Sequence, residues 1–176
     1  MPIRKRVADI LTLSRVILAV AIVCLGLILG AEALPWIVLL AIATWTTDSL
    51  DGPIARSSQV PTSTWIGDHD LLVDVVLATG VLVYMIAAGF VNLYLALAFL
   101  LVWALLFRRY GLPFTLGGFF QALVYGCFVI FSLIEAPMAG LLLVGWLLVA
   151  AIVNWPRFGR QLVPAFLAGF SELRRR

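Results

Sequence analysis

Five of the nine acidic residues of this 176-residue chain gather in one polar stretch, residues 47–74. Asp48 and Asp51 are three residues apart, and Asp70 and Asp74 are four apart, so each pair shares one face of a helix. The linker between the two pairs is short, so we expect their helices to be antiparallel neighbours with both pairs near the same end. Four neighbouring carboxylates repel one another, and in apolar surroundings each costs free energy unless it is paired or hydrated. A bound cation removes both costs. All-oxygen ligation suits Mg²⁺, Mn²⁺ or Ca²⁺ and argues against zinc.

Three further residues in this stretch indicate a substrate that contains phosphate. Gly52 has no side chain, so a ligand can approach the backbone there. Ala55 is small and lies one helical turn beyond Asp51, while Arg56 is a forked donor suited to phosphate. The alternative is that the acids are helix caps or solvated interfacial residues. We prefer that alternative only for Asp68, which falls outside both pairs.

The composition indicates an integral membrane protein with a single domain, residues 1–176. Hydrophobic residues make up 64% of the chain and charged residues 12%, about half the charged fraction of a typical soluble domain. The apolar residues come in long blocks, and a block of about 18 or more residues predicts a transmembrane helix.

We therefore expect an all-α fold, a six-transmembrane-helix bundle with interfacial amphipathic helices at both ends. The amphipathic segments are residues 1–15 and 155–176, and the spans occupy residues 16–153. The six apolar blocks cover residues 16–29, 34–54, 64–88, 91–107, 112–134 and 138–153. Gly26 and Gly30 form a small-xxx-small pair, which is typical of close helix packing.

A cleaved signal peptide is the alternative for the N-terminus. Basic residues 4–6 precede an apolar run, and residues 31–33 resemble a signal-peptidase site. The apolar run is too long for a signal peptide, so we expect an uncleaved first helix.

The basic residues predict the orientation. All twelve fall at the two ends of the chain or in the second-to-third and fourth-to-fifth loops, and the opposite loops have none. By the positive-inside rule, both termini and the aspartate cluster face the cytoplasm. In a prokaryote the membrane would be the plasma membrane.

The spacing of these residues resembles a known family signature. Asp48-x-x-Asp51-Gly52-x-x-Ala55-Arg56 is similar to D-x-x-D-G-x-x-A-R, the first half of the signature of the CDP-alcohol phosphatidyltransferases. The second half of that signature is G-x-x-x-D-x-x-x-D. Residues 8–15, ADILTLSR, further resemble the N-I-L-T-L-x-R segment of the phosphatidylglycerophosphate synthase branch.

The second half of the signature is shifted in this chain. Ile66 stands where the glycine is expected, and Gly67 comes one residue late. The family's usual spacing would place His69 and Val73 at the two aspartate positions. We prefer the register that uses Asp70 and Asp74, because it needs only a small insertion in the linker.

The resemblance implies a reaction and a set of ligands. Asp48, Asp51 and Asp70 would hold two divalent ions, Mg²⁺ or Mn²⁺, and Asp74 would act as a ligand and as general base. The base would take the proton of an acceptor hydroxyl. The oxygen would then attack the phosphorus of a CDP-linked lipid such as CDP-diacylglycerol, and CMP would leave.

The resemblance also implies the partners. Gly52, Ala55 and Arg56 would line the CDP site together with Asp48. The acceptor would be a polar alcohol or alcohol phosphate, with glycerol 3-phosphate as the best candidate. Membrane lipids and a second copy of the chain, in a homodimer, are further implied partners, and we expect no nucleic-acid partner.

Three arginines outside the cluster are candidates for binding the acceptor. Arg108 and Arg109 end the fourth apolar block on the same side as the cluster, where they could bind a phosphate. Anchoring at the cytoplasmic surface is the alternative for both. Arg15 either reaches the same pocket or extends its guanidinium to the membrane surface.

Two other functions remain open at this point. The shifted Gly67 is compatible with a catalytically silent relative that binds CDP-lipid or metal as a scaffold or regulator. A cation transporter could use the same aspartates, but it gives no reason for Gly52, Ala55 and Arg56.

Overall fold

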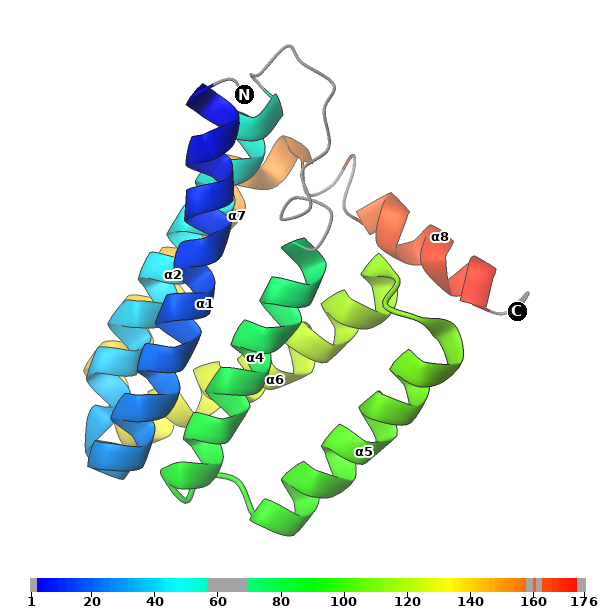
Figure 1. Cartoon of the computed structure of the whole chain (residues 1–176). Coiled ribbons are helices and arrows are strands. Elements are labelled where there is room, and N and C mark those ends of the chain that lie inside the picture. The colour runs from blue at the N-terminus through cyan, green and yellow to red at the C-terminus, as the bar shows by residue number, and fades with distance from the viewer. Residues whose placement is uncertain (1–2, 57–69, 158–159, 161–162, 174–176) are drawn as a thin grey trace.

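The computed structural model describes residues 3–56, 70–157, 160 and 163–173, and all regular structure in these ranges is helical. The helices are α1 (Ile3–Leu29), the short 3-10 helix η1 (Gly30–Ala33), α2 (Leu34–Arg56), α4 (Asp70–Ala87), α5 (Leu93–Tyr110), α6 (Phe114–Glu135), α7 (Pro137–Arg157) and α8 (Val163–Leu173). Figure 1 shows their arrangement. The predicted all-α fold is confirmed.

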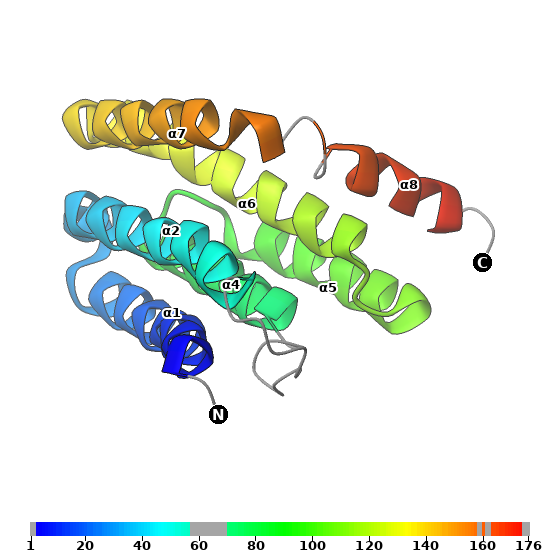
Figure 2. The same cartoon turned by 90° about the horizontal axis from the view of Figure 1, so that it is seen from above.

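Helix α1 is the element on which the first half of the bundle is assembled. It packs along both α2 and α4, and α4 in turn packs against α6. Helix α7 covers α6 and α2, as the view from above shows (Figure 2). The sequence predicted α2 and α4 to be antiparallel neighbours. The two helices run in opposite directions. Among the described residues, however, α2 and α4 make little direct contact with each other, and α1 packs against both.

Gly26 allows the close approach of α1 and α4. A Cβ atom at Gly26 would lie only 2.6 Å from Cδ2 of Tyr84 on α4, so only a glycine fits there. The predicted packing role of Gly26 is therefore confirmed. Gly30 has a different role from the one predicted, since nothing lies within 4 Å of its Cβ position and its φ of 55° makes the turn into η1.

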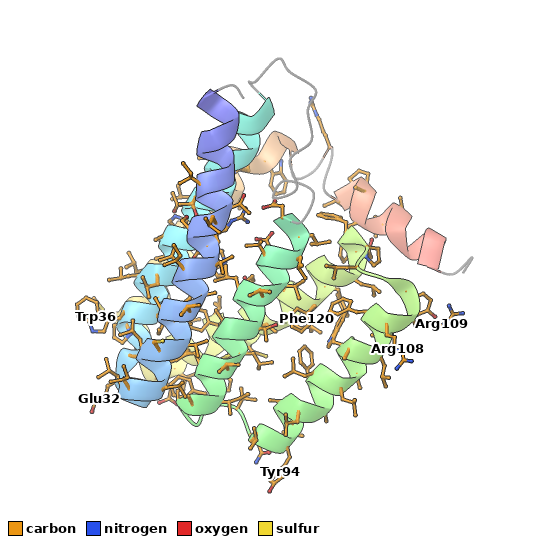
Figure 3. The ribbon with its side chains drawn as sticks, in the orientation of Figure 1. Glu32, Trp36, Tyr94, Arg108, Arg109 and Phe120 are labelled. Carbon is orange, nitrogen blue, oxygen red and sulfur yellow. The ribbon has the colours of Figure 1, made fainter. Side chains whose placement is uncertain are left out.

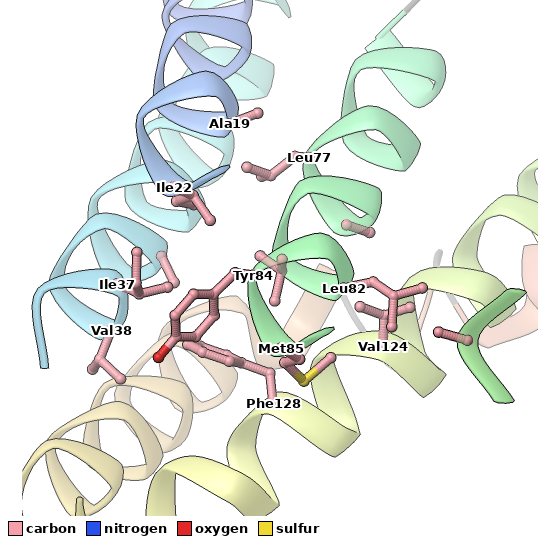
Figure 4. Close-up of a cluster of buried hydrophobic side chains, with 14 of the residues drawn as sticks. Ala19, Ile22, Ile37, Val38, Leu77, Leu82, Tyr84, Met85, Val124 and Phe128 are labelled. Carbon is pink, nitrogen blue, oxygen red and sulfur yellow. The ribbon is translucent and has the colours of Figure 1, made fainter. Parts of the chain in front are cut away.

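The core of the bundle lies where α1, α2, α4 and α6 meet (Figure 4). Ile22, Ile37, Tyr84 and Phe128 come from these four helices, and all four side chains are fully buried. The rings of Tyr84 and Phe128 pack edge to face, with their centroids 6.4 Å apart. Such pairs add about 0.5–1.5 kcal/mol to the effect of area burial alone.

Helix α5 reaches α6 through aromatic side chains. Phe120 of α6 lies 5.5 Å from both Phe99 and Trp103 of α5, measured between ring centroids. Phe107 contacts the same ring at 6.0 Å. Large rings keep the two helix axes apart while filling the space between them.

Five stretches of the described chain are long and apolar enough to cross a membrane. The first, Thr12–Thr47, contains the turn at η1 and so includes α1 and α2, which makes five to six such helices. Large apolar side chains point outward, for example Ile28 (77% exposed), Leu95 (70%) and Ile152 (74%). Apolar surface of this kind is suited to lipid, and the protein is an integral membrane protein.

The two ends of the chain differ from each other. Residues 1–15 were expected as an interfacial helix that runs on into the first span. From Ile3 onward they form the first turns of α1, which continues without a break to Leu29. The interfacial position of these turns stays a prediction. At the other end, α8 is a separate helix that packs against α6. Thr115 of α6 donates a hydrogen bond to the carbonyl oxygen of Phe166 at 3.2 Å, which holds α8 in place.

Candidate functional site

Helix α4 presents an acidic pair to α1 at its N-terminal end. Asp70 is its first residue and Asp74 lies one turn later, so both carboxylates project from the same face. Gly117 of α6 supports this turn from the other side. A Cβ atom at Gly117 would lie 2.8 Å from Cδ1 of Leu71, so the glycine lets α6 approach the start of α4 closely.

Arg15 of α1 holds both carboxylates with one guanidinium group. Its Nη1 donates to Oδ1 of Asp74, and its Nη2 donates to Oδ1 of Asp70. Thr12, one turn earlier on α1, accepts a hydrogen bond from Nη2 of Arg15 at 3.2 Å. The Thr12 hydroxyl also lies 3.5 Å from Oδ1 of Asp70. Four side chains from two helices thus form one polar cluster.

The members of this cluster differ in their access to solvent. The side chain of Arg15 is 0% exposed, whereas those of Asp70 and Asp74 are 42% and 21% exposed. Burying a guanidinium is costly unless carboxylates pair with it. The carboxylates lie on the accessible side, where a ligand can reach them.

The end of α2 carries the other half of the predicted site. Asp48, Asp51, Gly52, Ala55 and Arg56 all fall in its last turns, at the end of the bundle where α4 begins (Figure 1). The positions of their side chains lie outside what the structure describes, as do Asp68, His69 and Gly67. The predicted convergence of Asp48 and Asp51 with the acidic pair of α4 therefore stays a prediction.

Hydroxyl groups flank Asp48 on α2 and bond to their own helix. Thr46 and Ser49 donate to the carbonyl oxygens four residues earlier, at 2.6 and 2.8 Å, and Thr47 donates to the carbonyl of Thr44 at 2.7 Å. Bonds of this kind satisfy polar groups without a partner helix and often bend the helix. Polar side chains are thereby accommodated in the turns that lead to the acidic residues.

Arg108 and Arg109 lie at the C-terminal end of α5, and both are exposed. Both point away from the bundle (Figure 3), and the guanidinium of Arg109 lies 5.2 Å from the centroid of the Tyr110 ring. The structure does not bring them to the acidic pair of α4. Their predicted part in binding the acceptor stays a prediction.

Arg15 is the candidate residue whose position the sequence left undecided. The alternative of a guanidinium extended to the membrane surface is excluded by its full burial between Thr12 and the acidic pair. The available signal was its position in a helix that continues into an apolar span. A buried guanidinium there requires carboxylate partners.

The acidic pair carries oxygen donors of the kind that a divalent cation prefers. The guanidinium of Arg15 donates to Oδ1 of both Asp70 and Asp74, so the two carboxylates converge on a single positive charge. Their donor atoms are the hard oxygens that Mg²⁺ and Mn²⁺ prefer. Within the described part of the chain, no third metal-binding side chain joins these two acids. Further ligands would come from Asp48 and Asp51.

A comparison with known families matches most of the chain. The family model described as CDP-alcohol phosphatidyltransferase matches residues 5–156. The chain belongs to this family, which is a class of membrane enzymes of phospholipid biosynthesis that transfer a phosphatidyl group from a CDP-alcohol. The family is generally dependent on divalent metal. No match was found among curated proteins or among solved structures.

Proposed function

We propose that this protein transfers a substituted phosphate group from a CDP-linked lipid, such as CDP-diacylglycerol, to an alcohol and releases CMP. Glycerol 3-phosphate is the acceptor that we propose first, because residues 8–15 resemble the phosphatidylglycerophosphate synthase branch. The observation that carries the proposal is the convergence of Asp70 and Asp74 on one cationic group, within a chain that belongs to this family.

The proposed cation site uses both halves of the motif. Asp48 and Asp51 of α2 and Asp70 of α4 would hold two divalent ions, with Asp74 as a further ligand. When bound, such ions neutralise the diphosphate of the donor and stabilise the leaving oxygen.

Asp74 is the proposed general base. Its carboxylate is partly exposed, so an acceptor hydroxyl can reach it from the solvent side. Asp74 takes the proton of that hydroxyl, the new bond forms between the hydroxyl oxygen and the phosphorus that carries the lipid, and the bond from that phosphorus to CMP breaks. A positioned base of this kind contributes about 10²–10⁴-fold to a rate.

Residues on α2 form the proposed nucleotide site. Gly52 leaves room for the nucleotide against the backbone, and Ala55 keeps the next turn clear. Arg56 would donate to the diphosphate, and Asp48 would contribute to the same site.

The test is CMP release by the purified protein in detergent or lipid nanodiscs. The substrate is CDP-diacylglycerol, offered with glycerol 3-phosphate and with a panel of other polar alcohols, in Mn²⁺, in Mg²⁺ and in EDTA. We expect CMP release that requires both an acceptor and a divalent ion. No metal-dependent CMP release with any acceptor would refute the proposal. Nucleotide binding without turnover would instead support a catalytically silent relative.

A further inference from the structure

Arg15 places a permanent positive charge at the carboxylates that are proposed to hold a divalent ion. Its Nη1 contacts Oδ1 of Asp74, and its Nη2 contacts Oδ1 of Asp70. The guanidinium is fully buried, and Thr12 binds it from the same helix. The guanidinium end of the contact is therefore in the interior, while the carboxylates are partly exposed. The contact thus differs from a fully exposed ion pair, which contributes little.

Charge balance makes the guanidinium and a divalent ion compete. Two carboxylates carry two negative charges, and Arg15 neutralises one of them. An arginine cannot lose its proton in a protein, so its charge persists. A divalent ion at the same oxygens would meet this charge within a few ångströms, where repulsion in a partly buried site is strong. Strong cation binding thus requires that the guanidinium moves away.

We propose that Arg15 is the internal counter-ion of Asp70 and Asp74, and that a divalent cation binds these carboxylates in competition with its guanidinium. The inference rests on the proposed function, which takes both aspartates as cation ligands. It adds an exchange of partners: Arg15 joins α1 to α4 when it holds the carboxylates, and it leaves them when the cation takes its place.

The competing account makes Arg15 a permanent support. In that account its contacts with Oδ1 of Asp70 and Asp74 orient the carboxylates, and their other oxygens bind the cation. The two accounts predict opposite effects of removing Arg15 on cation affinity. Removal of a support weakens cation binding, whereas removal of a competitor strengthens it.

The first experiment measures Mn²⁺ affinity. The full-length protein is purified in detergent, stripped of metal by a chelator and titrated with Mn²⁺, and free Mn²⁺ is followed by its electron paramagnetic resonance signal. We expect Arg15→Gln to bind Mn²⁺ at least about tenfold more tightly than the unchanged protein, because one neighbouring positive charge is removed. Arg160→Gln is the matched control: it makes the same change at an exposed arginine, and its affinity should equal that of the unchanged protein.

A second measurement covers the case in which Arg15→Gln folds poorly. Loss of the guanidinium removes the contact that both carboxylates make with Arg15, and Mn²⁺ can replace that contact. We therefore expect Arg15→Gln to melt at a lower temperature than the unchanged protein in EDTA, and Mn²⁺ to raise its melting temperature by more. Arg15→Lys keeps the charge but loses the fork that reaches both carboxylates, so its Mn²⁺ affinity should lie between the other two.

A double variant tests whether the gain in Mn²⁺ affinity arises at the Asp70 and Asp74 carboxylates. Adding Asp74→Asn to Arg15→Gln should remove the gain in Mn²⁺ affinity. Equal or weaker Mn²⁺ binding by both Arg15 variants would overturn the competition while leaving the proposed reaction intact if CMP release persists. Absence of Mn²⁺ binding in the unchanged protein and in both variants would also overturn it, and would remove the metal from the proposed reaction.

Discussion

Arg15 and Asp74 form an ion pair across 59 residues of sequence, and it joins the first helix of the chain to the start of α4. The same guanidinium holds Asp70, so the N-terminal helix takes part in the acidic site directly. The family match begins at residue 5 and thus includes this part of α1. The N-terminal helix therefore lies within the matched region and contacts the acidic pair directly.

The hydroxyl of Thr12 should contribute measurably to stability. Thr12 is 5% exposed and lies within hydrogen-bond distance of both Arg15 and Asp70. Thr12→Val keeps the shape and removes the hydroxyl, and we expect it to lower the free energy of unfolding by about 1 kcal/mol. Denaturant unfolding in mixed micelles measures this change. Thr12→Ser keeps the hydroxyl and should remain near the unchanged protein; equal stability of the two variants would contradict the assignment.

Gly117 should be necessary for the position of the first turn of α4. A Cβ atom there would lie 2.8 Å from Cδ1 of Leu71, the residue next to Asp70. We expect Gly117→Val to destabilise the protein by about 1–3 kcal/mol, the usual cost of overpacking. Leu71→Ala in the same chain should recover part of this loss, because it removes the atoms that clash.

A matched glycine on α6 gives the control for this prediction. Nothing lies within 4 Å of a Cβ atom at Gly126, so Gly126→Val should cost less than Gly117→Val. Both variants carry the same loss of flexibility and the same β-branched side chain. Equal melting temperatures for the two would show that the contact with Leu71 is unimportant.

Gly169 should control the docking of α8. Its Cβ position lies 1.7 Å from Oγ1 of Thr115, which donates to the carbonyl of Phe166. We expect Gly169→Ala to release α8 from α6 and to increase hydrogen exchange of the amides in residues 163–173. Gly145→Ala on α7, where nothing lies within 4 Å, is the control and should leave that exchange unchanged. Unchanged exchange in Gly169→Ala would contradict the contact.

The fold could be predicted largely from the sequence, because burial in lipid leaves few choices for a backbone. Long apolar blocks require helices, since every backbone polar group must be satisfied within its own segment. The neighbours of each helix were harder to predict. A short linker between α2 and α4 suggested that they pack together, yet α1 packs along both. That choice depends on close contacts such as Gly26 with Tyr84, which sequence spacing does not show.

The acidic pair of α4 was predictable from its spacing, but its partner was not. Asp70 and Asp74 are four residues apart, which already places them on one helix face. Arg15 lies more than fifty residues away, and its partners depend on how α1 packs on α4. Electrostatics alone required a carboxylate partner without specifying which one. The packing of α1 on α4 determines which carboxylates pair with Arg15.

The most direct test of the proposed reaction is the rate of CMP release by Asp74→Asn and Asp51→Asn. Asparagine has nearly the shape of aspartate but cannot accept the proton or supply a negative ligand. We expect each variant to lose at least about 100-fold in rate with CDP-diacylglycerol, glycerol 3-phosphate and Mn²⁺, in line with the loss of a general base or a metal ligand.

The matched control is Glu32→Gln, the same chemical change at the far end of the bundle (Figure 3), which should retain the full rate. All three variants should elute as folded protein in size-exclusion chromatography. The account predicts loss of CMP release in both aspartate variants and its retention in the control. Full turnover by Asp51→Asn and Asp74→Asn would contradict the role assigned to the acidic cluster.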